Sequence, residues 1–168
     1  MNKIKLRYQQ VSDARKFWEI LNHPDFIYFP NKPKTIKDEI DYLRLNREKR
    51  KNNLEYNFSI TIRDDVVGAI GVMIDQRRPH IGEIGYFIDR KHWGKGIASR
   101  SVKLVEEFIE QELHLHRIEI KMNKKNKGSV LVAEKCGYRK EGIQIGKLSI
   151  GNEYADAYSY AKVVGKNP

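Results

Sequence analysis

The sequence predicts a single α+β domain over residues 1–168, with a sheet of about seven strands. The 168 residues are enough for one hydrophobic core and too few for two comfortable ones. Strand patterns, in which apolar and polar residues alternate, are grouped in the middle of the chain, while helical patterns stand before and after them. This order differs from the regular strand and helix alternation of a doubly wound parallel sheet.

The N-terminal third predicts a strand and two helices. Residues 4–8 alternate as in a half-buried strand. Ser12 is a suitable N-cap for the first helix, which Pro24 ends, and Thr35 with Asp38 has the spacing of a capping box at the second. The inner faces of these helices should carry Ala14, Phe17, Trp18 and Leu21, and then Ile36, Ile40 and Leu43.

The middle of the chain predicts three strands joined as hairpins. The first covers 58–62, a turn at Asp64 and Asp65 leads to an apolar strand over 66–74, and a third strand covers 81–89. A long amphipathic helix follows and packs on the sheet until about Leu113.

The last third predicts one more strand, a short helix and a terminal strand pair. The strand covers 117–122, and the helix covers 129–136 and is closed by Gly137. The terminal strands cover 138–150 and 154–164, around a glycine-containing turn.

Composition limits where the protein works. No stretch approaches the roughly 18 apolar residues that span a bilayer, and the opening MNKIKLRYQQ lacks the apolar core of a secretion signal. The single Cys136 cannot form an internal disulfide, in agreement with a reducing compartment, and core packing is the expected role of this thiol. We therefore expect a cytoplasmic protein with no membrane partner.

The charge balance raises the question of an anionic partner. Lys and Arg number 32 against 22 Asp and Glu, a formal charge of +10. The densest basic run, 44–51, should form a solvated helix end, and no RNA-binding pattern with stacking aromatics occurs, so direct nucleic-acid binding is not expected. His114 and His116 have no cysteine or carboxylate cluster of ligand spacing nearby, so no metal is expected either.

The segment Trp93 to Ser99 joins a strand to the long helix through Gly94 and Gly96. Glycines allow unusual dihedrals and close approach of a ligand, and the free amides at a helix start attract phosphate, so a pyrophosphate is the natural ligand. A loop with a structural role alone is the alternative, because short glycine motifs also occur by chance. The spacing approaches that of a dinucleotide-binding loop, with Glu119 downstream. That alternative is disfavoured because the loop follows an antiparallel meander in mid-chain.

Several motifs occur in order: Gly85-Tyr86-Phe87-Ile88-Asp89, Trp93-Gly94-Lys95-Gly96-Ile97-Ala98, Asn126-x-x-Ser129, Glu134-Lys135-Cys136-Gly137-Tyr138 and Glu141-Gly142. Together they resemble the GNAT superfamily of N-acetyltransferases, most closely its RimJ/RimL-like branch, over nearly the whole chain. The resemblance implies a mixed, mostly antiparallel sheet with helices on both faces and a V-shaped splay between two central strands. It also implies acetyl-CoA as co-substrate, no metal, and a primary amine as acceptor, preferably a protein N-terminal amine.

The resemblance implies which residues bind acetyl-CoA. The main chain of Ile88 would bond the pantetheine arm, and the amides from Gly94 to Ala98 would hold the pyrophosphate. Lys91 stands where the family has Gln or Arg, and Lys95 either adds charge or faces water. The expected contacts are Ile88, Lys91, Gly94, Lys95, Gly96, Ile97, Ala98, Ser99, Asn126 and Ser129.

The resemblance also points to Glu83 and Ser129 as catalytic residues. A glutamate at the position of Glu83 accepts the amine proton in parts of the family, whereas the alternative is an outward-facing glutamate paired with Arg77 or Arg78. Many relatives have a tyrosine general acid where this chain has Ala133, so Ser129 or a water would protonate the leaving thiolate. Helix capping is the alternative role of either Asn126 or Ser129.

The loop between the first two helices borders the acceptor side in the resembled family. Tyr28 and Phe29 are therefore expected to line the acceptor groove, and Phe26 to pack in the core. A polyamine or an aminoglycoside is the alternative acceptor, and a catalytically silent acyl-CoA-binding module is the alternative function. The sequence does not set the oligomeric state and leaves a homodimer open.

Overall fold

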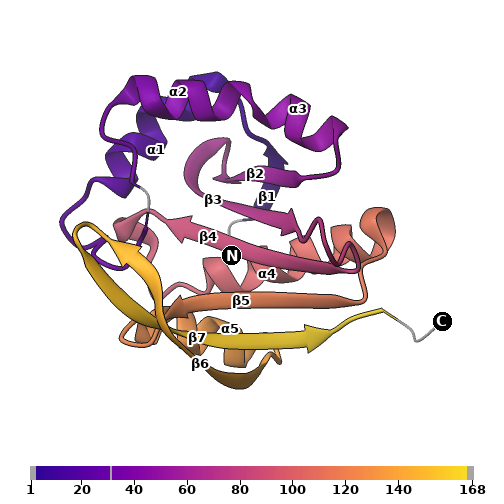
Figure 1. Ribbon diagram of the computed structural model, residues 1–168. Helices are drawn as coiled ribbons and strands as arrows, with labels where there is room; N and C mark the ends of the chain where they lie inside the picture. Colours follow the sequence, from indigo (N-terminus) through magenta and orange to yellow (C-terminus); the bar gives the residue numbers. More distant parts are fainter. Residues whose placement is uncertain (1–2, 31, 166–168) are drawn as a thin grey trace.

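The computed structural model describes residues 3–30 and 32–165, which form a seven-stranded sheet in the order β1-β2-β3-β4-β5-β7-β6 (Figure 1). The expected α+β class is confirmed. All neighbouring strands run antiparallel except β4 and β5. The strands are β1 (Ile4–Tyr8), β2 (Glu55–Ile62), β3 (Asp65–Ile74), β4 (Ile81–Ile88), β5 (Arg117–Asn123), β6 (Arg139–Ile150) and β7 (Glu153–Val163).

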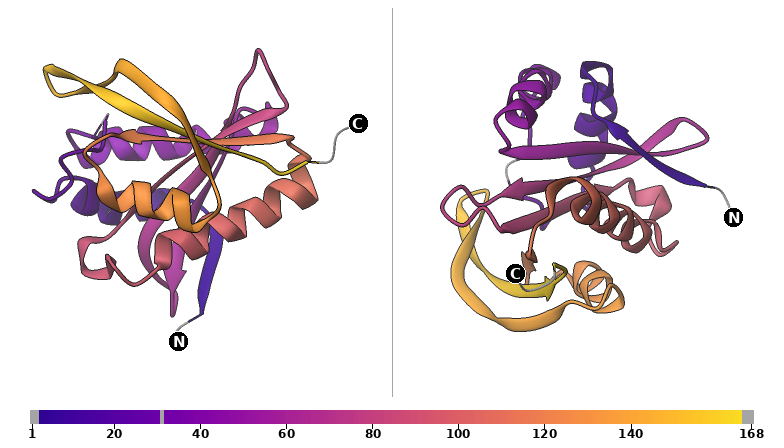
Figure 2. Two further views of the ribbon diagram at one scale, coloured as in Figure 1. Left: turned by 90° about the horizontal axis from the view of Figure 1, so that it is seen from below. Right: turned by 90° about the vertical axis from the view of Figure 1, so that its right-hand side faces the viewer.

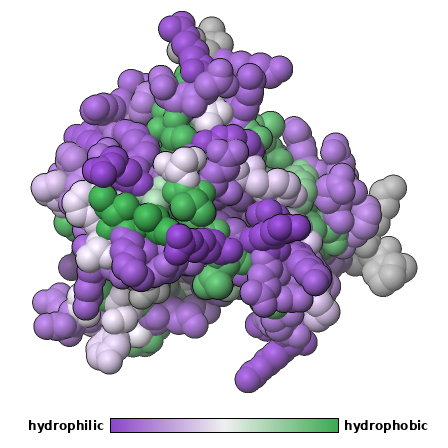
Figure 3. Space-filling view, turned by 90° about the horizontal axis from the view of Figure 1, so that it is seen from above, coloured by the Kyte–Doolittle hydropathy of each residue, from purple (hydrophilic) through white to green (hydrophobic). Residues whose placement is uncertain are grey.

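Helices cover both faces of the sheet (Figure 2). On one face lie α1 (Ala14–Leu21), α2 (Ile36–Arg44) and α3 (Asn46–Lys51), and on the other lie α4 (Ile97–Phe108) and α5 (Lys127–Lys135). Seen from the side of α1 to α3, the surface is mostly hydrophilic, with a smaller group of hydrophobic residues near its centre (Figure 3). Short turns of 3-10 helix, η1 (Val11–Asp13) and η2 (Arg90–His92), and a π-helical turn, η3 (Ile109–Leu113), complete the chain.

The main core lies between the sheet and α4. Strand alternation sends Ile84, Tyr86 and Ile88 of β4 toward this core, while Phe87 points to the opposite face and packs below α1 and α2. The strand that leads to the glycine loop is therefore fixed on both faces.

Some local expectations need correction. Ser12 does not cap α1, because it lies inside η1 and its hydroxyl contacts Gln10 instead. Ile20 is buried on the inner face of α1, whereas Trp18 is only half-buried. The basic run at 44–51 is not the end of one long helix, because a new helix, α3, starts at Asn46.

Other local expectations are confirmed. The Thr35 side chain accepts from the amide of Asp38 at 3.2 Å, and the Asp38 carboxylate accepts from the amide of Thr35 at 2.8 Å, which is the predicted capping box. The helix expected from Ser129 begins slightly earlier, at Lys127, and ends before Gly137, whose φ is 82°.

The sheet opens between β4 and β5. These strands pair only from Ile81 to Glu83 on β4 and from Arg117 to Glu119 on β5. Beyond this point β5 continues along β7, and the rest of β4 continues along β3. The expected V-shaped splay is therefore present, and one backbone edge of β4 from Ile84 to Ile88 has no strand partner among residues 3–30 and 32–165.

Candidate active site

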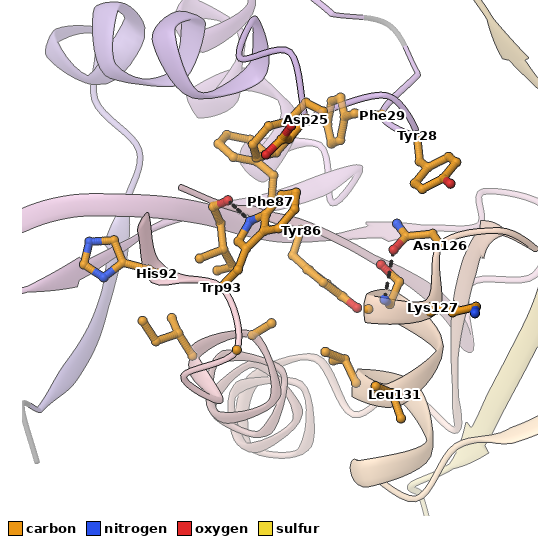
Figure 4. Close-up of a pocket in the computed structure, with 18 of the residues that line it drawn as sticks. Asp25, Tyr28, Phe29, Tyr86, Phe87, His92, Trp93, Asn126, Lys127 and Leu131 are labelled. Atoms are coloured by element: carbon orange, nitrogen blue, oxygen red, sulfur yellow. Dashed lines mark hydrogen bonds between the residues drawn. The ribbon is translucent and has the colours of Figure 1, made fainter. Parts of the chain in front are cut away.

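A large pocket lies at the open end of the splay, with a volume of about 1140 Å³ (Figure 4). Its walls come from the loop after α1, the end of β4, the start of α4 and the length of α5. Segments far apart in the sequence therefore meet around one space.

The glycine loop forms the wall of the pocket at the start of α4. Gly94 and Gly96 have left-handed φ angles of 73° and 70°, and a Cβ added to either would meet no atom within 4 Å. In the described part of the chain no side chain caps α4, and its first turn has no acidic residue. The positive end of this helix therefore faces the pocket without a protein anion to neutralise it.

The structure separates the predicted loop residues into two groups. Gly94, Gly96 and the first turn of α4, Ile97, Ala98 and Ser99, line the pocket, whereas Lys91 and Lys95 are not among its lining residues. The ammonium of Lys95 donates to the carbonyl of Lys91 at 2.8 Å, so it closes the loop on its outer side.

Ile88 lines the pocket, but its carbonyl oxygen is already engaged. The indole Nε1 of Trp93 donates to that oxygen at 2.7 Å, and the Trp93 ring packs on Phe26 with centroids 5.5 Å apart (Figure 4). Phe26 is buried, as expected. No sequence pattern indicated the bond between Trp93 and Ile88, which ties the loop to the end of β4.

Asn126 and Ser129 both line the pocket at the start of α5. The Asn126 side chain accepts from the amide of Ser129 at 3.1 Å, so Asn126 is the N-cap of this helix and Ser129 is not. The capping alternative for the Ser129 hydroxyl is therefore wrong.

Tyr86 is a pocket residue to which sequence reasoning assigned no role. It reaches from β4 toward the start of α5 (Figure 4). Its hydroxyl is buried and, among the described residues, has no hydrogen-bond partner. Burial raises the pKa of Tyr86 to about 12; the nearby Ser129 counteracts the shift, although no hydrogen bond joins the two hydroxyls. The sequence did hold a signal for this position, because Tyr86 stands two residues before Ile88 in the Gly-Tyr-Phe-Ile motif and therefore on the same face of β4.

Glu83 does not line the pocket and lies at the base of the splay, in the last residue pair between β4 and β5. Its carboxylate accepts from Lys121 at 2.6 Å, and Lys121 also pairs with Glu119 at 3.0 Å. The expected alternative partners, Arg77 and Arg78, were wrong, since Glu83 pairs with Lys121 and Arg78 pairs with Asp75. The role of Glu83 as a base stays a prediction.

Tyr28 and Phe29 line the pocket from the loop after α1, and Tyr28 lies on the side of Asn126 (Figure 4). The Phe29 ring packs edge-on against Phe87, with the ring centroids 5.6 Å apart.

Cys136 is buried, and its Sγ lies 3.5 Å from the carbonyl oxygen of Ser99. Burial is the main cause that raises the pKa of the thiol. This agrees with the packing role expected for Cys136.

Residues 3–30 and 32–165 contain no group of His, Cys, Asp and Glu side chains that would hold a metal ion. Over the same residues, no helix has both the length and the apolar character needed to cross a membrane.

Comparisons with known proteins agree with this geometry. Residues 3–139 match the sequence profile of a family described as the acetyltransferase (GNAT) domain. The chain is 38% identical to the probable N-acetyltransferase YjcK of Bacillus subtilis, over 73% of this chain and 69% of YjcK. It is 26% identical to a ribosomal-protein-serine acetyltransferase of Escherichia coli, over 97% of this chain and 88% of that protein. The fold superposes on the ribosomal-protein-S5-alanine acetyltransferase of Vibrio fischeri with a TM-score of 0.88, at 24% identity, over 100% of this chain and 97% of that one.

Proposed function

Because this chain belongs to the GNAT acetyltransferase family, we propose that it transfers the acetyl group of acetyl-CoA to a protein N-terminal amine. The observation that best supports the proposal is that two features lie next to each other at one pocket. In the part of the chain that the structure describes, a helix start without a side-chain cap and with an open glycine backbone stands beside a strand edge without a strand partner.

These features suit the parts of CoA. The pyrophosphate would bind the amides from Gly94 to Ala98, where the dipole of α4 favours negative charge. The pantetheine arm has two amides and would lie along the unpaired edge of β4 and near Asn126, with the Ile88 carbonyl shared with Trp93. CoA supplies the thioester that makes the acetyl group transferable.

In the proposed reaction the neutral amine nitrogen attacks the thioester carbonyl carbon. The C–N bond forms, the C–S bond breaks, and the electron pair of that bond leaves with the sulfur. Glu83, which lies at the base of the splay and pairs with Lys121, would accept the amine proton through a water. Ser129 would return a proton to the sulfur, and the Tyr86 hydroxyl is a second donor on the same wall.

The acceptor is the less constrained part of the proposal. An α-amine has a pKa near 8, about two units below a lysine side chain, so it needs little help from a base. The E. coli and V. fischeri proteins above are named for ribosomal-protein serine and alanine acetylation, which supports an N-terminal acceptor. Tyr28 and Phe29 would border the acceptor groove.

We also propose that residues 1–168 form a single domain and that the protein works in the cytoplasm.

A thiol-release assay with acetyl-CoA tests acceptor and activity together. The panel contains peptides with free N-termini, the same peptides with blocked N-termini, spermidine and aminoglycosides. We expect release with the free peptides and none with the blocked ones. Turnover only with spermidine or an aminoglycoside would replace the acceptor, and tight acetyl-CoA binding without any turnover would favour a silent acyl-CoA-binding module.

A further inference from the structure

Gly85 lies in the middle of β4, in a row of three residues that crosses the sheet. Asn57 on β2 pairs with Gly71 on β3, and Gly71 pairs with Gly85. The Asn57 side chain fills the space above Gly71, since its Oδ1 would lie 2.1 Å from a Cβ added there. A Cβ added to Gly85 would meet no atom within 4 Å, and Gly85 is exposed. The space above Gly85 is therefore open, whereas the space above its neighbour in the row is filled.

This open space lies on the face of the sheet that carries the candidate base. Side chains alternate along a strand, so Glu83, Gly85 and Phe87 share one face, with about 7 Å between one and the next. Phe87 packs below α1 and α2 on that face and also lines the pocket. The open space at Gly85 thus lies between Glu83, at the base of the splay, and the pocket wall at Phe87.

Gly85 also stands on the strand edge that faces the splay. Pairing of β4 with β5 ends at Glu83, so in the described part of the chain the next residues of β4 have no strand partner on this side. The pantetheine arm is proposed to lie along this edge. A molecule on the face of α1 to α3 can approach the edge closely at Gly85, because no side chain stands in between.

Resting on the proposed function, we propose that the first residue of the acceptor lies over Gly85, which makes Gly85 a specificity-determining residue. The amine points to the open edge of β4 and reaches Glu83 through a water. The side chain of the first residue takes the space that a Cβ on Gly85 would occupy. The absence of a side chain on Gly85 therefore sets how large the first residue of the acceptor can be.

Steady-state kinetics with peptides that differ only in their first residue, glycine, alanine, serine or leucine, tests this limit. The measured quantity is kcat/KM for the largest first residue that wild type accepts, divided by kcat/KM for glycine. Gly85→Ala should lower this ratio by about tenfold, and Gly85→Val by more, since one methyl group in a fitted space is worth on the order of tenfold. The Kd for acetyl-CoA should stay unchanged, because the added side chain projects from the face of the sheet and not along the edge.

Gly142→Ala and Gly142→Val are the matched controls. Gly142 is also a strand glycine without a positive φ and with open space at its Cβ position, but it lies on β6 and does not line the pocket. Both control variants should keep the wild-type ratio. Because neither glycine has an atom within 4 Å of its Cβ position, all alanine variants should also keep the wild-type Tm.

Three outcomes would overturn the role of Gly85. They are a ratio that both Gly85 variants leave unchanged, including an equal loss for all peptides, a raised Kd for acetyl-CoA in Gly85→Ala, and acceptance of glycine alone by wild type. Absence of acetyl-CoA binding, or of turnover with every peptide, in wild type would instead defeat the proposed function.

Discussion

At the scale of single residues, Gly96 is where the proposed pyrophosphate site can be tested. Its φ is 70°, and a Cβ there would project into open space within the pocket wall. We expect Gly96→Leu to weaken acetyl-CoA binding by about tenfold or more, because the side chain occupies the space of the phosphates. Titration calorimetry measures the effect.

Gly151 provides the control for backbone strain. It also has a left-handed φ, 61°, with open space around its Cβ position, but it lies in the turn between β6 and β7. Gly151→Leu should cost a similar free energy of unfolding, about 1 to 2 kcal/mol, and leave acetyl-CoA affinity unchanged. Equal loss of affinity in both variants would mean that strain, not lost phosphate space, is responsible.

Glu39, on α2, is a buried carboxyl group that ties stability to pH. It is 7% exposed, and burial raises its pKa to about 7. Its folded pKa lies above its unfolded value, so its contribution to stability is complete below about pH 4.5 and is lost as the pH rises through about 7. We expect the free energy of unfolding of wild type to fall by up to about 3 kcal/mol over this range relative to Glu39→Gln.

Urea unfolding at a series of pH values measures this difference. Glu107→Gln, at an exposed position on α4, serves as control and should follow the wild-type curve. Parallel curves for wild type and Glu39→Gln would show that this carboxyl group is not desolvated.

The role of Glu83 can be distinguished from that of Glu119 by mutation, because both carboxylates pair with the same lysine, Lys121. We expect Glu83→Gln to lower kcat by about 10²-fold, the usual range for loss of a base, with acetyl-CoA affinity almost intact. Glu119→Gln removes the other carboxylate from the same lysine and should keep most of the turnover. If both variants behave alike in the thiol-release assay, Glu83 only has a structural role.

Sequence patterns predicted residues whose role is local and missed those whose role is a distant contact. Gly94 and Gly96 shape the turn before α4, and the Asn126 side chain caps α5, so the type and spacing of these residues were informative. The contact between Glu83 and Lys121 joins residues 38 positions apart, and the lone hydroxyl of Tyr86 depends on what packs around it. Neither was visible without the fold.

At the scale of elements, the bond between the Trp93 indole and the Ile88 carbonyl joins the end of β4 to the loop before α4. Because Trp93 lines the pocket, acetyl-CoA binding should change its fluorescence emission. The change should persist in Trp18→Phe, whose indole bonds the carbonyl of Lys34 outside the pocket, and disappear in Trp93→Phe. A change that survives Trp93→Phe would place the ligand elsewhere.

Elements with strong periodicity or caps were predicted closely, as the capping box at Thr35 shows. The break between α2 and α3 was missed, because no Pro or Gly marks it. The splay was expected only from family resemblance. The splay arises because β4 and β5 pair over only three residues before they separate. The register of two strands joined by a crossover depends on the packing of the whole sheet.

At the scale of the whole molecule, a continuous sheet and a core shared by β1 to β5, α4 and α5 predict a single cooperative unfolding unit. Unfolding curves from near-UV circular dichroism and fluorescence should coincide. Acetyl-CoA at about 100 times its Kd should add roughly 2.7 kcal/mol, or about 5 to 10 °C in Tm. Two separate transitions would contradict the single domain.

The two places where β6 departs from regular pairing with β7 affect how copies of the protein interact at high concentration. This strand is an outer edge of the sheet, yet its register against β7 shifts after Lys140 and again after Gln144. The interrupted row of outward amides and carbonyls offers no long template to the strand of another copy. We therefore expect the outer edge of the β6–β7 hairpin to pair poorly with a strand of another copy when many copies are crowded together.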